Sequence, residues 1–434
     1  MGSLDRRQFL GAIAKPAAVA SMVISNPSLM ANAYSKIKKA TGDPKSVAKD
    51  EAYWREIQQG YTADRGLINL NNGGVSPSPT VVQEALKRHL DFSNTSPAYS
   101  MWRILEPQKE TVRRRMARFF NCDTEEIALT RNASEGLQIC QNGFDLEAGD
   151  EVLTTTQDYG RMIATFKQRE CRDGIVMKQF KIPVPAENEN EIVRLFEKNI
   201  TPKTKLILMC HMINITGQIL PVKKVVKMAR KYNIPVIVDG AHTFAHFDFN
   251  IDDLDCDYYA TSLHKWLSAP FGTGMLYVRK NKIEGLWPMQ AAWSSECKND
   301  DIRKFEEIGT HPCPNKIAIG DALTFHQGIG SKNKEARLIY LRDRWAKRLI
   351  KNDRIKLHTS LKPGKSCAIA TVEIEGIDTS AVAKELWDKY RIFVVAINHD
   401  EFTGCRVTPH VYTTIEEIDR FSDAMESIIK NGIG

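Results

Sequence analysis

The sequence lacks the features that mark several classes of protein. It has no Cys-x-x-Cys pair, no internal repeat and no low-complexity tract, which argues against a zinc knuckle, a redox dithiol and a repeat architecture. Its apolar stretches are too short or too interrupted to span a bilayer as a helix. Hydrophobic residues make up 42% and charged residues 26% of the 434 residues, which is typical of a globular chain with two or three domains or one large two-part body.

A strong excess of charge of one sign is also missing. Lys+Arg 60 stand against Asp+Glu 53, and of the net +7, residues 1–33 carry +2 and residues 34–50 carry +3. The remaining +2 is spread over residues 51–434. Nothing in this nearly neutral body predicts a surface for nucleic acid or for a membrane.

The first 33 residues are typical of an export signal. Arg6-Arg7 is followed by Phe9-Leu10, by an interrupted apolar stretch and by Ala31-Asn32-Ala33, which is the order of a secretory leader. The paired arginines before Phe-Leu resemble a twin-arginine leader, a route for proteins that are already folded. The alternative is an amphipathic N-terminal helix. We expect residues 1–33 to be removed on export to the periplasm and residues 34–70 to form a Lys-rich tether and arm.

The chain has nine cysteines, an odd number, and they are widely spaced. A disulfide scaffold would need denser spacing in a shorter chain. We interpret them as mostly buried, reduced thiols that folding before export would protect.

Short apolar runs alternate with helical patterns over the middle of the chain. The runs that predict strands lie at residues 127–130, 151–154, 175–180, 205–210, 235–238, 258–261 and 274–278, and the patterns that predict helices lie at 81–92, 106–120, 135–140, 162–170, 191–198 and 222–232. This rhythm predicts an α/β fold with a large, mostly parallel sheet covered on both faces. Arg113, Arg114 and Arg115 in the helix 106–120 are expected on a solvated face.

After about residue 293 the pattern changes. It predicts a long helix over 315–349, strands over 367–374 and 391–397, and helices over 380–390 and 415–429. We therefore divide the chain into a large domain, residues 71–300, and a smaller C-terminal α+β domain, residues 301–434.

One lysine stands in an unusual setting. Lys265 follows a predicted strand, with Ser262 and His264 before it and a glycine-rich turn after it. A semi-buried amine of this kind suits a nucleophile that forms a Schiff base, whereas a lysine alone would be an ordinary surface residue.

Two further segments carry polar groups at the ends of predicted strands. Asp239 directly follows the strand 235–238, at the sheet edge where ligands bind. A buried Asp needs a cation, and a protonated pyridine nitrogen would be one, although a helix-capping role is the alternative. Asn132-Ala133-Ser134 joins a strand to a helix, where N–H groups and the Ser134 hydroxyl could bind an anion or simply cap the helix.

Together, Asn132-Ala133-Ser134, Asp239-Gly240-Ala241-His242 and Ser262-Leu263-His264-Lys265-Trp266 resemble, in order and spacing, the class V aminotransferases of pyridoxal-phosphate fold type I. Within this family they are similar to the isopenicillin N epimerase-like branch. The resemblance runs from about Asn69 to the end of the chain. It implies a large, mostly parallel sheet of the seven-stranded type, a small C-terminal α+β domain and pyridoxal 5′-phosphate as cofactor.

The resemblance also implies a role for each matching position. Lys265 would bind the cofactor covalently and move protons, and Asp239 would pair with its ring nitrogen. The other implied contacts are Ser134, Ser262 and His264 for the phosphate, Asn132 and Ala133 beside them for the cofactor, His242 and Asn214 for the ring 3-oxygen, Tyr159 for stacking on the ring, Arg406 for the substrate carboxylate, and Asn72 and Gly73 for the loop that closes over the substrate. Thr310 would complete the phosphate site of a neighbouring subunit, which implies a homodimer. The alternatives are a core aromatic for Tyr159 and a structural ion pair for Arg406.

Members of this family diverge after the proton leaves the α-carbon. A cysteine desulfurase needs a nucleophilic Cys in the loop before the carboxylate-binding Arg, and residues 396–404 contain none. Epimerisation needs proton delivery to both faces of the α-carbon, whereas transamination and elimination need a single base. We predict an enzyme that acts at the α-carbon of an amino acid or of a peptide-linked residue, as an aminotransferase or epimerase, with no metal. The alternatives are a C–S lyase for a sulfur amino acid and a non-catalytic binding protein that kept the fold.

Overall fold

The structure is a computed structural model that describes residues 42–291 and 299–434. The predicted leader, most of the tether and Cys297 lie outside the described residues. Within these two ranges, no helix is both long enough and apolar enough to cross a bilayer.

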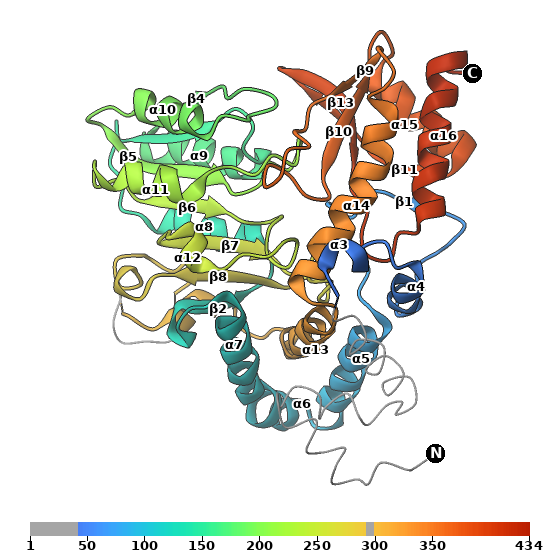
Figure 1. Cartoon of the computed structure of the whole chain (residues 1–434). Helices are drawn as coiled ribbons and strands as arrows, with labels where there is room; N and C mark the ends of the chain where they lie inside the picture. Colours follow the sequence, from blue (N-terminus) through green and yellow to red (C-terminus); the bar gives the residue numbers. More distant parts are fainter. Residues whose placement is uncertain (1–41, 292–298) are drawn as a thin grey trace.

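A seven-stranded sheet forms the centre of the large domain (Figure 1). Its order is β2-β8-β7-β6-β5-β3-β4, and β8 alone runs antiparallel to its neighbours. The strands are β2 (Ile127–Thr130), β3 (Glu151–Thr155), β4 (Val176–Phe180), β5 (Thr204–Cys210), β6 (Val236–Asp239), β7 (Tyr258–Ser262) and β8 (Gly274–Val278). The predicted large, mostly parallel sheet is confirmed.

Helices cover both faces of this sheet, and β5 shows why. Leu206 and Leu208 face one core, with α8 and α9, while Ile207 and Met209 face the other, with α10 and α11. Strands buried on both faces become continuous apolar runs. The covering elements are α8 (Ala133–Gly143), α9 (Gly160–Asp173), α10 (Glu189–Asn199), α11 (Val222–Arg230) and α12 (Ile251–Leu254), with short helices η3 (Thr124–Glu126), η4 (Lys280–Lys282) and η5 (Ile302–Glu306).

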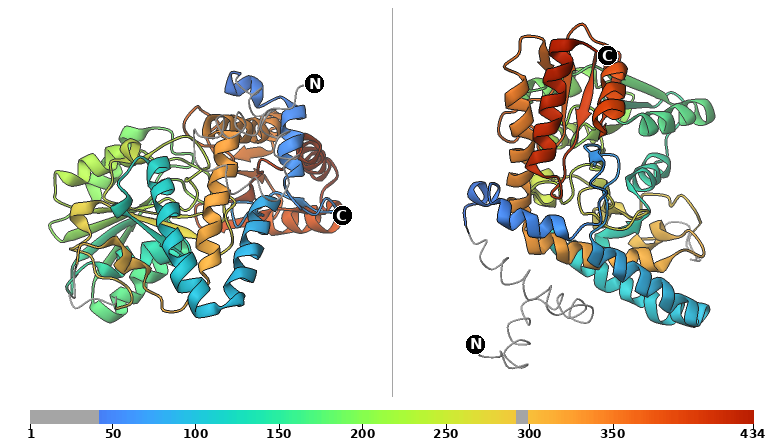
Figure 2. Two further views of the ribbon diagram at one scale, coloured as in Figure 1. Left: turned by 90° about the horizontal axis from the view of Figure 1, so that it is seen from below. Right: turned by 90° about the vertical axis from the view of Figure 1, so that its right-hand side faces the viewer.

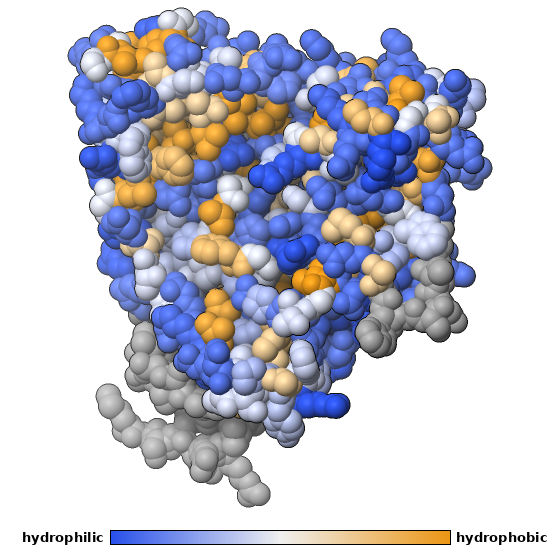
Figure 3. Space-filling model, turned by 180° about the vertical axis from the view of Figure 1, so that it is seen from behind, coloured by the Kyte–Doolittle hydropathy of each residue, from blue (hydrophilic) through white to orange (hydrophobic). Residues whose placement is uncertain are grey.

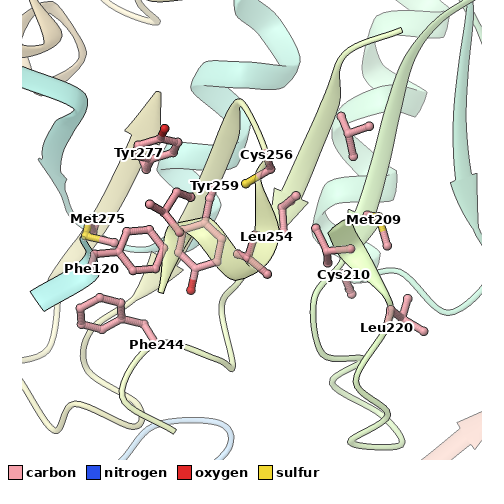
Figure 4. Close-up of a cluster of buried hydrophobic side chains, with 14 of the residues drawn as sticks. Phe120, Met209, Cys210, Leu220, Phe244, Leu254, Cys256, Tyr259, Met275 and Tyr277 are labelled. Atoms are coloured by element: carbon pink, nitrogen blue, oxygen red, sulfur yellow. The ribbon is translucent and has the colours of Figure 1, made fainter. Parts of the chain in front are cut away.

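Aromatic side chains fill the core where β7 and β8 meet the helix α7 (Glu106–Phe120). The ring of Phe120 lies 5.0 Å from that of Tyr259 and 5.6 Å from that of Phe244 between ring centres. Figure 4 shows the rings of Phe120, Phe244 and Tyr259 grouped beside the strands. The core therefore supports the strands that carry Asp239 and Ser262.

An arm of helices extends from the large domain (Figures 1 and 2). It consists of α5 (Thr80–Thr95), α6 (Pro97–Tyr99), η2 (Ser100–Leu105) and α7, and α13 (Cys313–Ile329) packs against α5 and α7. The single helix predicted over 315–349 is wrong, because the chain turns at Gly330, whose φ of 85° suits glycine. The second half is α14 (Ser331–Leu349).

The small domain contains a four-stranded antiparallel sheet in the order β12-β13-β10-β9. Its elements are β9 (Ile355–Leu357), β10 (Ala370–Ile374), β12 (Val395–His399), β13 (Phe402–Val407), α15 (Thr379–Tyr390) and α16 (Ile415–Asn431). The predicted strand 391–397 is two strands, and the first, β11 (Ile392–Phe393), pairs with β1 (Ile68–Asn69). The chain before the large domain is thereby attached to the small one.

The described part of the predicted tether is packed. It forms α3 (Pro44–Val47), which is followed by α4 (Glu51–Gln59). The Trp54 indole donates a hydrogen bond of 2.8 Å to the Val47 carbonyl, and Arg337 on α14 donates one of 2.9 Å to the Ala48 carbonyl. The domain limits at residues 70 and 300 stay predictions.

The expectation that Arg113 lies on a solvated face is wrong. Its side chain is fully buried and pairs with Glu306 at 2.5 Å, while Arg114 is exposed. Glu306 also accepts a hydrogen bond of 2.6 Å from the Leu129 N–H of β2. Helical periodicity cannot reveal this pair, because its acid lies 193 residues away.

We expect Glu306→Ala to lower the free energy of unfolding by about 3–5 kcal/mol, because the buried Arg113 charge keeps only the partly exposed Glu110 as a partner and the Leu129 N–H loses its acceptor. Urea unfolding measures the change. The control is Glu84→Ala, which removes the exposed Lys87–Glu84 pair and should change stability by less than about 0.5 kcal/mol. Equal effects of the two substitutions on stability would contradict the assignment of Glu306 as the buried partner of Arg113.

Candidate active site

The carboxyl ends of β6 and β7 bring the predicted centre together. Asp239 is the last residue of β6, is 4% exposed, and accepts a hydrogen bond of 2.9 Å from the Ala241 N–H. Burial raises the pKa of its carboxyl to about 6, against the opposing effect of the Ala241 N–H and of Lys265. Among the described residues, it forms no ion pair within 4 Å. Asp239 is thus a buried acid that a cation would stabilise in its ionised form.

Lys265 follows β7 and reaches the residues that follow β6. Its Nζ lies 3.1 Å from Nε2 of His242. Burial and the Arg406 charge lower the pKa of this amine, while Asp239 raises it, and the balance is about 8. A small but useful fraction is therefore neutral, and nucleophilic, near pH 7.

His242 stays neutral at this centre. Burial and then the charges of Lys265 and Arg406 hold its pKa well below the ordinary value. Since a charged Lys265 can only donate to Nε2, the ring proton lies on Nδ1. Nδ1 is buried and has no hydrogen-bond partner among the described residues. An oxygen of a bound ligand would supply that partner.

The start of α8 forms an anion site. Asn132 Oδ1 accepts a hydrogen bond of 2.9 Å from the Glu135 N–H, and Ser262 Oγ accepts one of 3.0 Å from the Ala133 N–H. Within the part of the chain that the structure describes, the Ser134 N–H and hydroxyl have no hydrogen-bond partner. His264 Nδ1 donates to the Thr273 carbonyl at 3.2 Å, which leaves Nε2 available. These groups fit a phosphate at a helix N-terminus.

Close backbone packing shapes this anion site. Gly274 begins β8, and a Cβ there would lie 2.6 Å from the Asn132 Cα. No side chain fits in that space, so the glycine lets β8 approach the loop that precedes α8.

Arg406 brings a buried charge to the same centre from the small domain. It lies on β13, is 7% exposed, and donates hydrogen bonds of 3.0 Å to the Asn214 carbonyl and 2.9 Å to Asn71 Oδ1. No described carboxylate pairs with it, so the alternative of a structural ion pair has no partner in residues 42–291 and 299–434. Burial lowers the pKa of the guanidinium to about 10, and the nearby Tyr159 phenol opposes this. A carboxylate ligand would compensate the charge.

Of the remaining predicted residues, some lie at the centre and others do not reach it. Tyr159 immediately precedes α9 and is 38% exposed, which argues against a core aromatic. Asn214 reaches Arg406 through its backbone carbonyl. Thr310 is exposed and forms no hydrogen bond with these residues within the described chain, so its role toward a neighbouring subunit stays a prediction.

The loop before α5 is hydrogen-bonded to the segment that follows β13. Asn72 is fully buried, donates hydrogen bonds of 3.0 and 2.9 Å to the Asn69 and Thr408 carbonyls, and accepts one of 2.6 Å from Tyr412. The Gly73 N–H donates to Thr408 Oγ1 at 3.0 Å. Asn72 thus holds the loop in place, and its neighbour Asn71 contacts Arg406.

Sequence reasoning missed Asn71 and also Asp158. Asp158 Oδ1 accepts a hydrogen bond of 2.9 Å from the Cys210 N–H, and its Oδ2 accepts one of 2.7 Å from the Thr155 N–H. It therefore fixes the ends of β3 and β5 beside Tyr159. Its place in the loop four residues after the predicted strand 151–154 is a signal that could have identified it.

The β12–β13 hairpin also approaches this centre. His399 donates a hydrogen bond of 3.0 Å to the Thr156 carbonyl, and Glu401 accepts one of 2.9 Å from Gln157. Across residues 42–291 and 299–434, no group of three His, Cys, Asp or Glu side chains is placed to hold a metal ion.

Comparison with known proteins identifies one matching family and several relatives. The profile of the aminotransferase class-V family matches residues 68–421. Isopenicillin N epimerase of Amycolatopsis lactamdurans is 28% identical over 394 residues, covering 87% of this chain and 99% of that protein. A probable cysteine desulfurase of Synechocystis sp. is 25% identical over 388 residues, covering 84% and 91%.

Among solved structures, the cystine C–S lyase C-DES has the same fold. Its complex with cysteine persulfide gives a TM-score of 0.74 at 23% identity, covering 83% of this chain and 97% of that chain. A C-DES mutant with glycine covalently linked to its PLP cofactor gives 0.75 at 22% identity, covering 84% and 98%.

The pKa of Asp239 predicts a pH-dependent stability difference. Its folded value of about 6 lies above the ordinary 3.8, so the wild-type protein without ligand loses stability as the pH rises from about 4 through 6. Without ligand, Asp239→Asn should be more stable than wild type at pH 8 by up to about 3 kcal/mol and equal to it near pH 4. Urea unfolding at both pH values tests this, and a difference that does not depend on pH would refute it.

Proposed function

The chain belongs to the class-V aminotransferase family, and on that premise we propose that it is a pyridoxal-phosphate-dependent enzyme acting at the α-carbon of an amino acid or of a peptide-linked amino-acid residue. One observation carries the proposal. A buried carboxyl, Asp239, and a buried guanidinium, Arg406, both lie close enough to Lys265 to shift its pKa, and neither pairs with a described counterion. A ring cation and a substrate carboxylate would complement them.

Each residue has a distinct task in this proposal. Pyridoxal phosphate, when bound, supplies an electron sink for the electron pair left at the α-carbon. Asp239 would hold the ring nitrogen, and Ser134 with His264 would hold the phosphate. Arg406 would bind and orient the substrate carboxylate through a planar, two-donor contact. Lys265 would hold the cofactor and then take and return the α-proton at its Nζ.

Desulfuration through a cysteine of this chain is disfavoured. Residues 396–404 hold no Cys, and Cys405 is buried with its thiol donating toward the Thr379 carbonyl at 3.8 Å. Burial raises the pKa of this thiol to about 12, so it is not ionised near neutral pH. The identity to isopenicillin N epimerase supports an epimerase or aminotransferase reaction.

A C–S lyase is the second candidate. Elimination at the β-carbon needs a single base and no cysteine nucleophile, so Lys265 alone would serve it. The common fold with the lyase C-DES favours this alternative as well. A non-catalytic binding role is disfavoured, because it gives no reason for the chain to keep Lys265, Asp239, Ser134 and Arg406 together.

We further propose that the folded protein is exported to the periplasm and that two copies assemble, with Thr310 near the partner's phosphate site. Large apolar side chains are exposed on the arm, at Leu90, Phe92, Tyr99 and Trp102, and hydrophobic patches interrupt the mostly hydrophilic face in Figure 3. Sedimentation of the purified protein and N-terminal sequencing of the mature form test these two proposals.

Hydrogen exchange at the α-carbon tests the function whichever reaction follows. The protein loaded with pyridoxal phosphate is incubated in D2O with a panel of amino acids and short peptides, and deuterium uptake is read by mass spectrometry. We expect uptake with at least one member and none with Lys265→Ala. Interconversion of enantiomers, transfer of the amino group, or release of pyruvate with a thiol then distinguishes the reactions. No uptake across the panel and no binding of the cofactor would contradict the proposal.

Arg406→Gln separates substrate binding from cofactor binding. Losing a charge-assisted contact should raise the KM for the amino-acid substrate about 10- to 100-fold, with the affinity for pyridoxal phosphate unchanged. The KM for the matched amine, which lacks the carboxylate, should not change on the substitution. Arg354→Gln, a change in an arginine that donates to the Ile429 carbonyl of the small domain, is the control. An unchanged KM in Arg406→Gln would rule out the assigned role.

A further inference from the structure

His246 lies in the turn that follows β6, four residues after His242, and it is fully buried. Its ring meets three separate segments of the chain. Nδ1 lies 2.7 Å from the His242 carbonyl oxygen, and Nε2 accepts a hydrogen bond of 3.0 Å from the Ala368 N–H. The indole of Trp266 stacks on the ring face, with 3.5 Å between ring centres and 9° between planes.

The two ring hydrogen bonds define the state of His246. A carbonyl oxygen only accepts, so Nδ1 carries the proton, while an amide N–H only donates, so Nε2 carries the lone pair. Both positions are occupied, and the ring is neutral. Burial and the charges of Lys334 and Arg342 hold its pKa well below the ordinary value, against the opposing effect of the His242 carbonyl. His246 therefore acts as a hydrogen-bonded spacer and takes no part in proton transfer.

These contacts form a closed series, a circuit, that runs through His246, His242, Lys265 and Trp266. His246 holds the His242 carbonyl, and the His242 ring lies 3.1 Å from Lys265 Nζ. Lys265 is followed directly by Trp266, which returns to stack on His246. The third contact, to Ala368, joins the circuit to the small domain just before β10. A shift of the His246 ring would thus move the lysine segment and the His242 segment relative to each other.

We propose that His246 is a positioning residue that fixes His242 against Lys265, chiefly through the hydrogen bond from its Nδ1 to the His242 carbonyl. The inference rests on the proposed function, because it assigns a purpose to the geometry at Lys265. It adds a residue that would touch neither cofactor nor substrate.

Two substitutions separate the ring hydrogen bonds. In His246→Asn the side-chain amide lies at the position of Nδ1 and can still donate to the His242 carbonyl. In His246→Gln an oxygen can lie near the position of Nε2 and accept from Ala368, but the donor to His242 is lost. The control is His326→Asn, since His326 is also buried and its ring hydrogen-bonds only to Ser331 among the described residues.

The measurement is the reactivity of Lys265 in the protein without cofactor. Trace acetylation over a range of pH is read on the Lys265 peptide by mass spectrometry. It gives the pH midpoint at which half of the Lys265 amine has lost its proton. Burial is the main cause of the low wild-type value, so a loosened segment that admits water should move the midpoint upward. We expect a rise of about one pH unit in His246→Gln, a smaller rise in His246→Asn and no change in His326→Asn. At pH 7, the covalent attachment of pyridoxal phosphate should slow about tenfold in His246→Gln, in proportion to the neutral amine.

An unchanged midpoint in His246→Gln, an equal rise in Asn and Gln variants, or a rise in His326→Asn would each overturn the proposal. Thermal unfolding of each variant accompanies the measurement. If His246→Gln does not fold, Trp266→Leu removes the stacked indole instead, and the proposal requires a rise there too. The midpoint is measured without cofactor, so failure of wild-type Lys265 to bind pyridoxal phosphate would refute the proposed function alone.

Discussion

A carboxyl at the end of β6 and a guanidinium on β13 are buried at one centre, and within the described chain neither forms an ion pair. Burying an ion without a partner costs several kcal/mol, and the protein meets this cost twice, at Asp239 and at Arg406. The pKa values respond in the expected directions, upward for the acid and downward for the base. Such a site is strained without ligand and is compensated by a molecule that carries a cation and an anion at matching positions.

The rest of the fold holds these two groups and Lys265 at fixed positions. Asp239 and the Lys265 segment come from neighbouring parallel strands whose carboxyl ends share one edge. Arg406 comes from the other sheet, so the contacts between the two domains matter as much as the strands. Asn72 joins the loop before α5 to Thr408, and the β12–β13 hairpin holds the segment before Tyr159. These contacts use buried or partly buried hydrogen bonds, which specify geometry more sharply than apolar packing.

Much of this could be predicted from the sequence, and the failures have identifiable physical causes. The strands of the large sheet are buried on both faces and therefore read as short apolar runs, and the helix 106–120 carries a clear period. The prediction of a single helix over 315–349 was wrong because the sequence keeps a helical period on both sides of Gly330. Arg113 was misplaced because its partner is distant in sequence. Asn71 and His246 were missed because their roles depend on hydrogen bonds between segments far apart in the chain, which local patterns do not contain.

The central claim is that Lys265 is the lysine that binds pyridoxal phosphate. Lys334 is the alternative attachment site that this claim has to exclude, because its side chain is buried and burial lowers its pKa to about 7. Reduction of the cofactor-loaded protein with borohydride, followed by digestion and mass spectrometry, locates the attached group. The account predicts one pyridoxyl phosphate per chain, on the peptide that contains Lys265. A label on Lys334 or another lysine, or no label at all, would contradict it.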